Sequence, residues 1–145
     1  MKKVLFVCTG NTCRSPMAEA ILKSKNIPGL EVKSAGVFAA EGSAASANAG
    51  KVLTENEIDF NHQSTQLSAK EIDWASIVLT MTTSHKDAVL SHFPQANEKT
   101  FTLSEFAGQE GRNIADPYGG SIEIYRAAFR EIKDAIEKAE EKWKQ

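Results

Sequence analysis

An apolar run that leads through a short glycine-containing turn into a helix is the feature that most constrains the fold of this chain. Residues 4–7 are Val-Leu-Phe-Val, a composition typical of a buried strand. Ser15-Pro16 followed by helix-forming residues predicts that a helix begins on the far side of the turn. A strand, a tight turn and a helix in this order form the first unit of an α/β sheet.

The turn has the composition of an anion-binding loop. Residues 8–15 are Cys-Thr-Gly-Asn-Thr-Cys-Arg-Ser, in which Gly10 and Asn11 tolerate left-handed backbone angles. The N–H groups of such a turn and the helix dipole favour an anion, and they favour the thiolate of Cys8. Arg14 offers a planar fork that can hold two phosphoryl oxygens. We therefore predict a phosphoryl site with Cys8 as nucleophile; the alternative is that the cysteines only pack at a sheet edge.

Strands and helices alternate along the whole chain. Strands are predicted at residues 3–7, 31–34, 77–80 and 100–103. Helices are predicted at residues 16–25, 46–56 and 84–93, and from Ser68 and Ser121. The last helix carries one apolar stripe, which indicates a side that faces the core: Tyr125, Phe129, Ile132, Ile136, Ala139 and Trp143. This pattern predicts a doubly wound α/β protein with a parallel four-stranded sheet flanked by helices.

Length, charge and cysteine content limit the class of protein. With 145 residues and 41% hydrophobic content, we expect a single domain over residues 1–145. The net charge of -2 gives no general attraction for nucleic acid or anionic membranes. The apolar run after Lys2-Lys3 is too short for a signal peptide. Two cysteines five residues apart indicate a reducing cytoplasm. No cofactor or metal is expected, because no His, Cys, Asp and Glu cluster has ligand spacing.

The loop and several later motifs resemble the low-molecular-weight protein tyrosine phosphatase family. Residues 7–16 match its signature Val-Cys-x-Gly-Asn-x-Cys-Arg-Ser-Pro completely. The resemblance extends to Ser-Ala-Gly at residues 34–36, a third strand within residues 73–81, and Asp-Pro-Tyr at residues 116–118. It implies the fold of that family and a phosphatase that works through a cysteinyl-phosphate on Cys8. It also implies a phosphate-binding loop formed by Thr9, Gly10, Asn11, Thr12, Cys13 and Ser15.

Asp116 matches the position of the family's general acid. A phenolate or a neutral guanidine is a strong base, so its departure from phosphorus requires a proton. The same carboxylate can then take a proton from the water that attacks the cysteinyl-phosphate. Taken alone, Asp-Pro-Tyr-Gly-Gly is equally good turn sequence. Because the chain also contains the Cys8 loop, we favour the interpretation of Asp116 as a general acid.

The resemblance also implies an aromatic side chain on the wall of the substrate cleft. Phe38 is the nearest candidate, although residues 39–50 are themselves typical of an exposed connection. Asp116 and Phe38 would then approach the substrate from different loops.

Thr12 and Tyr118 depart from the pattern of tyrosine-directed members. Thr12 stands where those members normally carry an apolar residue, often Ile, and its hydroxyl could orient a polar substrate or water. Tyr118 is followed by two glycines, where many relatives carry a second aromatic residue. One aromatic face and one hydroxyl suit a planar cationic phosphoguanidinium. The two features resemble the bacterial protein-arginine-phosphatase branch; the plain alternative is that Thr12 satisfies a loop hydrogen bond.

We therefore expect a protein phosphatase acting on phosphoarginine, with phosphotyrosine as the next alternative. An arsenate reductase on this fold needs further cysteines, and residues 14–145 contain none, so only a glutaredoxin-dependent variant survives. A binding module that has lost catalysis would need neither Cys8 nor Asp116. We expect a monomer whose partners are phosphorylated proteins and, for its cysteines, a thiol reductant.

Two further loop residues have more than one interpretation. Cys13 is either a packing residue or, as in the resembled branch, the redox partner that traps oxidised Cys8 as a disulfide. Ser15 can cap the helix, donate to the sulfur of Cys8, or do both.

Three histidines complete the set of candidates. His62 could support the loop from behind, but a capping or surface position is the expectation for it and for His85 and His92.

Overall fold

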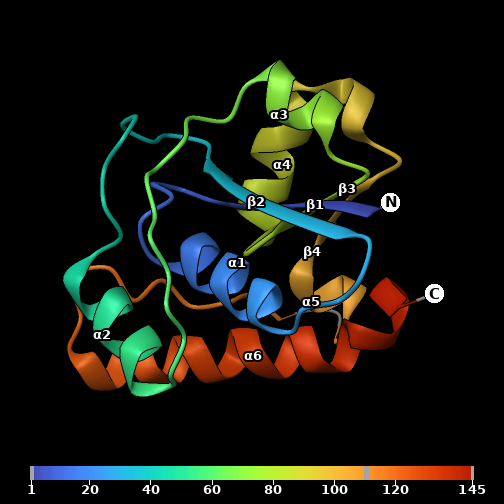
Figure 1. The fold of residues 1–145 in the computed structure, drawn as a ribbon. Coiled ribbons are helices and arrows are strands. Elements are labelled where there is room, and N and C mark those ends of the chain that lie inside the picture. The colour runs from blue at the N-terminus through green and yellow to red at the C-terminus, as the bar shows by residue number, and fades with distance from the viewer. Residues whose placement is uncertain (1, 110–111, 145) are drawn as a thin grey trace.

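A parallel four-stranded sheet lies at the centre of the protein (Figure 1). The computed structural model describes residues 2–109 and 112–144. The strands are β1 (Lys2–Cys8), β2 (Leu30–Gly36), β3 (Ile77–Thr80) and β4 (Thr100–Thr102). They lie in the order β2-β1-β3-β4, and every neighbouring pair is parallel. The predicted α/β fold is confirmed, with β1 inside the sheet.

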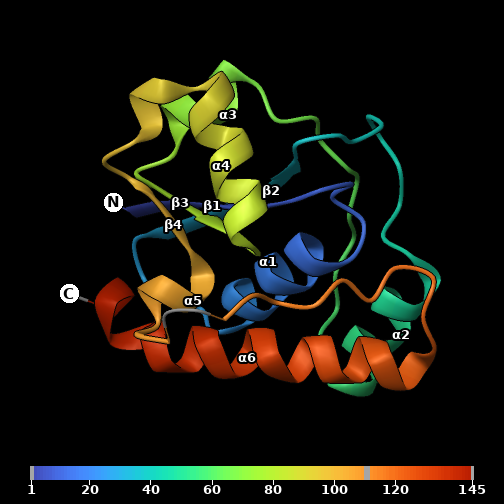
Figure 2. The same ribbon diagram turned by 180° about the vertical axis from the view of Figure 1, so that it is seen from behind.

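Helices cover both faces of the sheet (Figures 1 and 2). On one side lie α1 (Arg14–Ser24), α2 (Ala47–Glu55), α5 (Leu103–Phe106) and α6 (Ile122–Lys144). On the other side lie α3 (Ala69–Trp74) and α4 (Thr83–His92), followed by a 3₁₀ turn at Pro94–Ala96. Neither α5 nor the 3₁₀ turn was expected, and residues 73 and 74 belong to α3 rather than to the third strand. Among the residues described, no helix has the length and apolarity to cross a membrane.

The alternating side chains of β1 divide the core in two. Val4 and Phe6 pack with α1 and α6, whereas Leu5 and Val7 pack with α3 and α4. All four are fully buried. The predicted apolar stripe of α6 is also buried throughout. A strand covered on both faces needs a continuous apolar run, which explains the composition of residues 4–7.

Helix α1 begins at Arg14, two residues before the predicted start. Pro16 is the third residue of the helix, where its missing N–H costs no intrahelical bond. Cys13 occupies the N-cap position without a side-chain cap, so Ser15 does not cap the helix. Cys8 thus ends a rigid strand and Arg14 begins a rigid helix.

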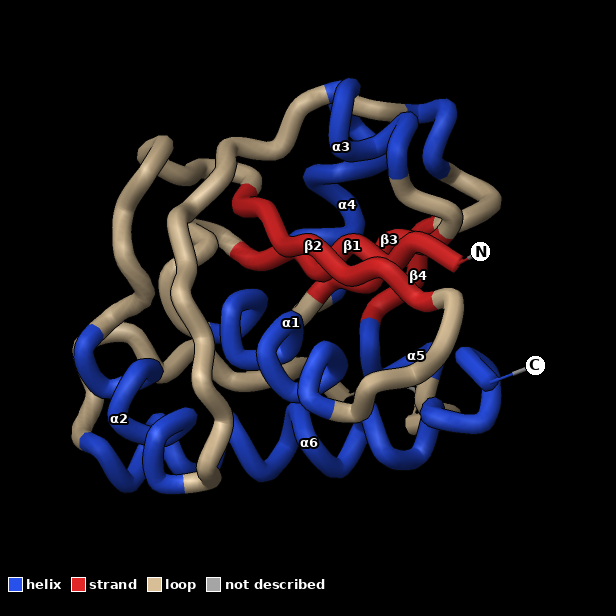
Figure 3. The backbone as a smooth tube through the Cα atoms, in the orientation of Figure 1, coloured by secondary structure: helices blue, strands red, loops and turns tan. Residues whose placement is uncertain are grey.

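Two long loops run side by side beyond the carboxyl end of β2 (Figure 3). The N–H of Gly42 donates to the carbonyl of Ser64 at 2.9 Å, and the N–H of Ser64 donates to that of Ser43 at 2.7 Å. Gly36, at the end of β2, lies against the loop after β1; a Cβ there would lie 2.9 Å from the backbone nitrogen of Asn11. The two hydrogen bonds join the loops to each other, and the close approach at Gly36 sets the end of β2 against the predicted anion loop.

Candidate active site

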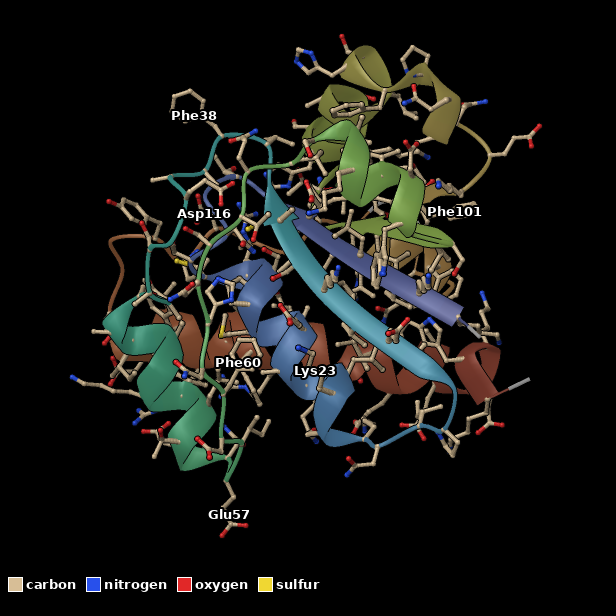
Figure 4. All side chains as sticks on the ribbon, turned by 45° about the horizontal axis from the view of Figure 1, so that its top comes forward. Lys23, Phe38, Glu57, Phe60, Phe101 and Asp116 are labelled. Atoms are coloured by element: carbon tan, nitrogen blue, oxygen red, sulfur yellow. The ribbon has the colours of Figure 1, made fainter. Side chains whose placement is uncertain are left out.

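A cavity of about 350 Å³ opens at the carboxyl end of β1. It is lined by Cys8, Thr9, Gly10, Thr12, Cys13, Arg14, Phe38, Asp116 and Tyr118. Figure 4 shows Phe38 projecting outward near Asp116 at this end of the sheet. The structure therefore brings together the three side chains predicted to be catalytic and the three predicted to select the substrate. Asn11 and Ser15 lie behind the loop instead.

Asn11 holds the loop in shape from behind. It is fully buried and has a left-handed φ of 56°, whereas Gly10 does not adopt a positive φ. Its Oδ1 accepts from the N–H of Thr65 at 2.8 Å, which leaves both protons of Nδ2 as donors. Nδ2 donates to the hydroxyls of Ser15 at 2.8 Å and Ser34 at 2.9 Å.

These bonds decide the direction of the contact between Ser15 and Cys8. The two side chains lie 2.9 Å apart at Oγ and Sγ. Because Asn11 already donates to the Ser15 oxygen, the hydroxyl proton of Ser15 is left to point at the sulfur. A hydrogen bond donated to sulfur stabilises the thiolate, which is the nucleophilic form of a cysteine.

The same chain of donors ends on a buried carboxylate. The hydroxyl of Ser34 donates to Oε1 of Glu19 at 2.6 Å. Nζ of Lys23 pairs with the other carboxylate oxygen at 2.5 Å. The charge of Glu19 is therefore compensated although the residue is buried, and the orientation of Ser34 is fixed.

Two histidines brace the loop from opposite sides, and the expectation of surface or capping positions was wrong for both. Nε2 of His62 donates to the carbonyl of Asn11 at 2.6 Å, and its ring stacks on Phe60. Nε2 of His85 lies 2.8 Å from Oγ1 of Thr9. Both histidines are buried. Their loop partners lie 51 and 76 residues away in the sequence, so no local pattern could reveal them.

The third histidine, His92, is exposed at the end of α4, as expected.

Arg14 is held in a fixed orientation inside the protein. Its Nη1 donates to the carbonyl of Ile114 at 2.8 Å, and Nη2 lies 3.6 Å from Oδ2 of Asp116. The N–H of Ile114 in turn donates to the carbonyl of Met81, directly after β3. The segment that carries Asp116 is thus attached to the sheet, and the guanidinium is buried.

The position of Asp116 is compatible with both interpretations of its motif. One carboxylate oxygen accepts from the N–H of Tyr118 at 3.0 Å, which forms the turn. The other faces Arg14 across the cavity, and the side chain is 56% exposed. An accessible carboxyl at the mouth of an anion site can exchange protons with a leaving group or with water.

The side chains of Thr12 and Cys13 differ in their polar contacts. Sγ of Cys13 lies 3.4 Å from the hydroxyl of Tyr125 and 3.5 Å from that of Ser46. Burial and the contact with Cys13 raise the pKa of Tyr125. Over the described part of the chain, the hydroxyl of Thr12 has one polar contact, at 3.8 Å to Sγ of Cys13. A contact of that length leaves the Thr12 hydroxyl available to the cavity.

Known proteins are similar to this chain over almost its whole length. Residues 3–145 match the family described as Low molecular weight phosphotyrosine protein phosphatase. A protein-arginine-phosphatase of Geobacillus stearothermophilus is 56% identical over 140 residues, which cover 97% of this chain and 95% of that one. A low molecular weight protein-tyrosine-phosphatase, PtpB of Staphylococcus epidermidis, is 38% identical over 94% of this chain and 95% of its own.

The fold also closely matches that of a solved structure. The YwlE arginine phosphatase from Geobacillus stearothermophilus superimposes with a TM-score of 0.96 at 56% identity, covering 98% of this chain and 92% of that one. The chain belongs to the low molecular weight phosphotyrosine protein phosphatase family.

Proposed function

We propose that this protein is a protein arginine phosphatase that hydrolyses phosphoarginine residues through a cysteinyl-phosphate. The observation that carries the proposal is the hydroxyl of Thr12, which lines the cavity and, among the residues described, has its one polar contact at 3.8 Å. It replaces the apolar side chain expected for a phenyl ring by a group that can bond a guanidinium. The relative that is 56% identical, named as an arginine phosphatase, supports the same substrate.

The first step transfers the phosphoryl group to sulfur. The thiolate of Cys8, bonded by Ser15, attacks phosphorus while the free N–H groups of Arg14 hold the phosphoryl oxygens. An S–P bond forms and the P–N bond breaks. Asp116 gives its proton to the departing guanidine nitrogen, so that arginine leaves as its stable cation.

The second step releases phosphate. The carboxylate of Asp116 takes a proton from water as the water oxygen attacks phosphorus. The S–P bond breaks and its electron pair returns to Cys8, whose sulfur again accepts the proton of Ser15 in a hydrogen bond. Every group that the two steps require lines or borders one cavity.

A tyrosine phosphatase is the second candidate, and it has an observation in its favour. Phe38 and Tyr118 are 84% and 77% exposed and both line the cavity, so two aromatic faces could contact a phenyl ring. Guanidinium groups also stack on aromatic rings, so these two residues favour neither substrate strongly.

A direct comparison of substrates decides between the two. We would measure kcat/KM for phosphoarginine and phosphotyrosine peptides of one sequence, with Cys8→Ala as the inactive control and Thr12→Ile as the specificity probe. A preference for phosphoarginine that Thr12→Ile reverses is the expected result. A preference for phosphotyrosine in the unmodified protein would overturn the proposal and reduce Thr12 to a structural residue.

We also propose that Cys13 is the redox partner of Cys8. A peroxide would oxidise the Cys8 thiolate to a sulfenic acid, and the Cys13 thiol would displace water from it to form a disulfide. A dithiol then reduces the disulfide and restores both thiols. We expect Cys13→Ala to lose activity irreversibly in peroxide; inactivation as reversible as in the unmodified protein would remove this role.

The proposed setting is a monomer in a reducing cytoplasm that acts on phosphorylated proteins. The cavity lining includes Cys8, Arg14 and Asp116, so one copy of the chain supplies all three predicted catalytic side chains. The catalytic thiol also requires reducing conditions to remain active.

A further inference from the structure

Thr9 and His85 form a polar pair that the proposed mechanism does not use. Thr9 directly follows the nucleophile and lines the cavity. Its Oγ1 lies 2.8 Å from Nε2 of His85, near the start of α4. His85 is buried and does not line the cavity, so it can act on a substrate only through Thr9.

Thr82 contacts His85 through both its backbone N–H and its ring. As the N-cap of α4, Oγ1 of Thr82 accepts from the backbone N–H of His85 at 3.1 Å. Its own hydroxyl proton can then be donated to Nδ1 of His85, 3.0 Å away. In that arrangement the imidazole proton is on Nε2, which donates to Thr9.

His85 is neutral at the pH where a phosphatase works. Burial, helped by the positive charge of Arg14, lowers the pKa of His85 to about 4, while Asp116 opposes the shift. One N–H therefore bonds Thr9 and occupies one lone pair of its oxygen. The other lone pair and the hydroxyl proton of Thr9 remain for the cavity.

We propose that the Thr9 hydroxyl, positioned by His85, is a specificity-determining contact that accepts a guanidinium N–H of phosphoarginine. This inference rests on the proposed function and adds a second hydroxyl to that of Thr12. A phosphoguanidinium carries N–H donors next to phosphorus, whereas the leaving group of phosphotyrosine carries none. A positioned acceptor at the cavity wall discriminates between the two, because only one of them can use it.

The ratio of two substrates separates this role from simple support of the loop. We would measure kcat and KM for phosphoarginine and phosphotyrosine peptides with Thr9→Val, His85→Phe and the double variant. Thr9→Val keeps the shape and removes the hydroxyl. Thr9→Ser and His85→Gln, which retain the hydroxyl and a donor, test for rescue. His92→Phe is the matched control, since His92 is exposed on the same helix.

The expected result is a roughly tenfold fall in the ratio of kcat/KM, phosphoarginine over phosphotyrosine, in Thr9→Val, mostly through KM. His85→Phe lowers the ratio in the same direction and adds nothing in the double variant, while the two conservative variants restore it. An equal loss on both substrates would overturn the inference, because it would show a structural role. So would losses that multiply in the double variant.

Binding keeps the test independent of the proposed function. On a Cys8→Ala background, which forms no cysteinyl-phosphate, calorimetry with the two peptides measures affinity without turnover. Thr9→Val should weaken phosphoarginine binding about tenfold more than phosphotyrosine binding; equal weakening would refute the contact. If the active protein prefers phosphotyrosine, the proposed function fails, and these two affinities still decide the role of Thr9.

Discussion

The hydroxyl of Ser15 lies 2.9 Å from the sulfur of Cys8 and directs its proton toward it, because Asn11 donates to the Ser15 oxygen from the other side. The direction of this hydrogen bond is thus set by the side-chain amide of Asn11, which contacts Ser15 and does not line the cavity. A hydrogen bond donated to sulfur stabilises its anionic form, which in the proposed mechanism first attacks phosphorus and later leaves it.

Ser15→Ala should lower kcat by roughly 10- to 100-fold, since sulfur loses its donor and Asn11 loses an acceptor. Stopped-flow assays would separate formation of the cysteinyl-phosphate from its hydrolysis. Ser24→Ala, in the same helix, is the control, because in the described part of the structure that hydroxyl bonds the carbonyl of Ile21 and no other group. An unchanged kcat in Ser15→Ala would mean that the backbone alone stabilises the thiolate.

Asp116→Asn should lower kcat for phosphoarginine by about 10²- to 10³-fold, because the amide cannot protonate the leaving guanidine. The loss should be much smaller in the first step with p-nitrophenyl phosphate, whose leaving group departs without a proton. Steady-state and burst kinetics with both substrates measure the difference. Equal losses would assign Asp116 to positioning Arg14 rather than to proton transfer.

His62→Ala should lower the free energy of unfolding by about 1–3 kcal/mol, because the carbonyl of Asn11 loses its buried donor. Activity should fall as well, since that carbonyl belongs to the anion loop. Urea denaturation and kcat are the measurements, with the exposed His92→Ala as the matched control. Equal stability of the two variants would show that water replaces the imidazole at no cost.

The free energy of unfolding should fall as pH decreases from about 6.5 to about 4, and His85 should account for part of the fall. Its pKa is about 4 in the folded protein, held down by burial and Arg14 against the opposing charge of Asp116, and near 6.5 when unfolded. The unfolded chain therefore binds more protons in that window, and the loss amounts to as much as about 3 kcal/mol. His85→Phe should show a shallower slope in urea denaturation; an identical slope would contradict the assignment.

The parts of the fold that depend on local sequence were predictable. Residues 4–7 indicated a buried strand, and the stripe from Tyr125 to Trp143 indicated a core-facing helix; both predictions are confirmed. Helix α5 was missed because four residues are too few to show periodicity. Its only signal is the capping box of Thr102 and Glu105, whose side chains bond each other's backbone N–H groups.

Within the site, the role of a residue could not be predicted where its contact partners lie far away in the sequence. Cys8 and Arg14 share one short motif, and Asp116 has a recognisable turn. His62, Glu19 and His85 act on the loop through contacts formed only when the chain folds, and each also suits an ordinary helix or loop position. Their roles could not be inferred without the structure.

The bond between Arg14 and the carbonyl of Ile114 has a consequence during synthesis. The nascent chain contains the complete motif by residue 16, yet the carbonyl that orients the Arg14 guanidinium lies 100 residues after Arg14. A nascent or truncated chain that ends before Ile114 therefore contains Cys8, but its Arg14 guanidinium is not oriented and Asp116 is absent. Phosphatase activity therefore requires translation beyond Asp116, so chains that end before this residue cannot act on phosphorylated proteins.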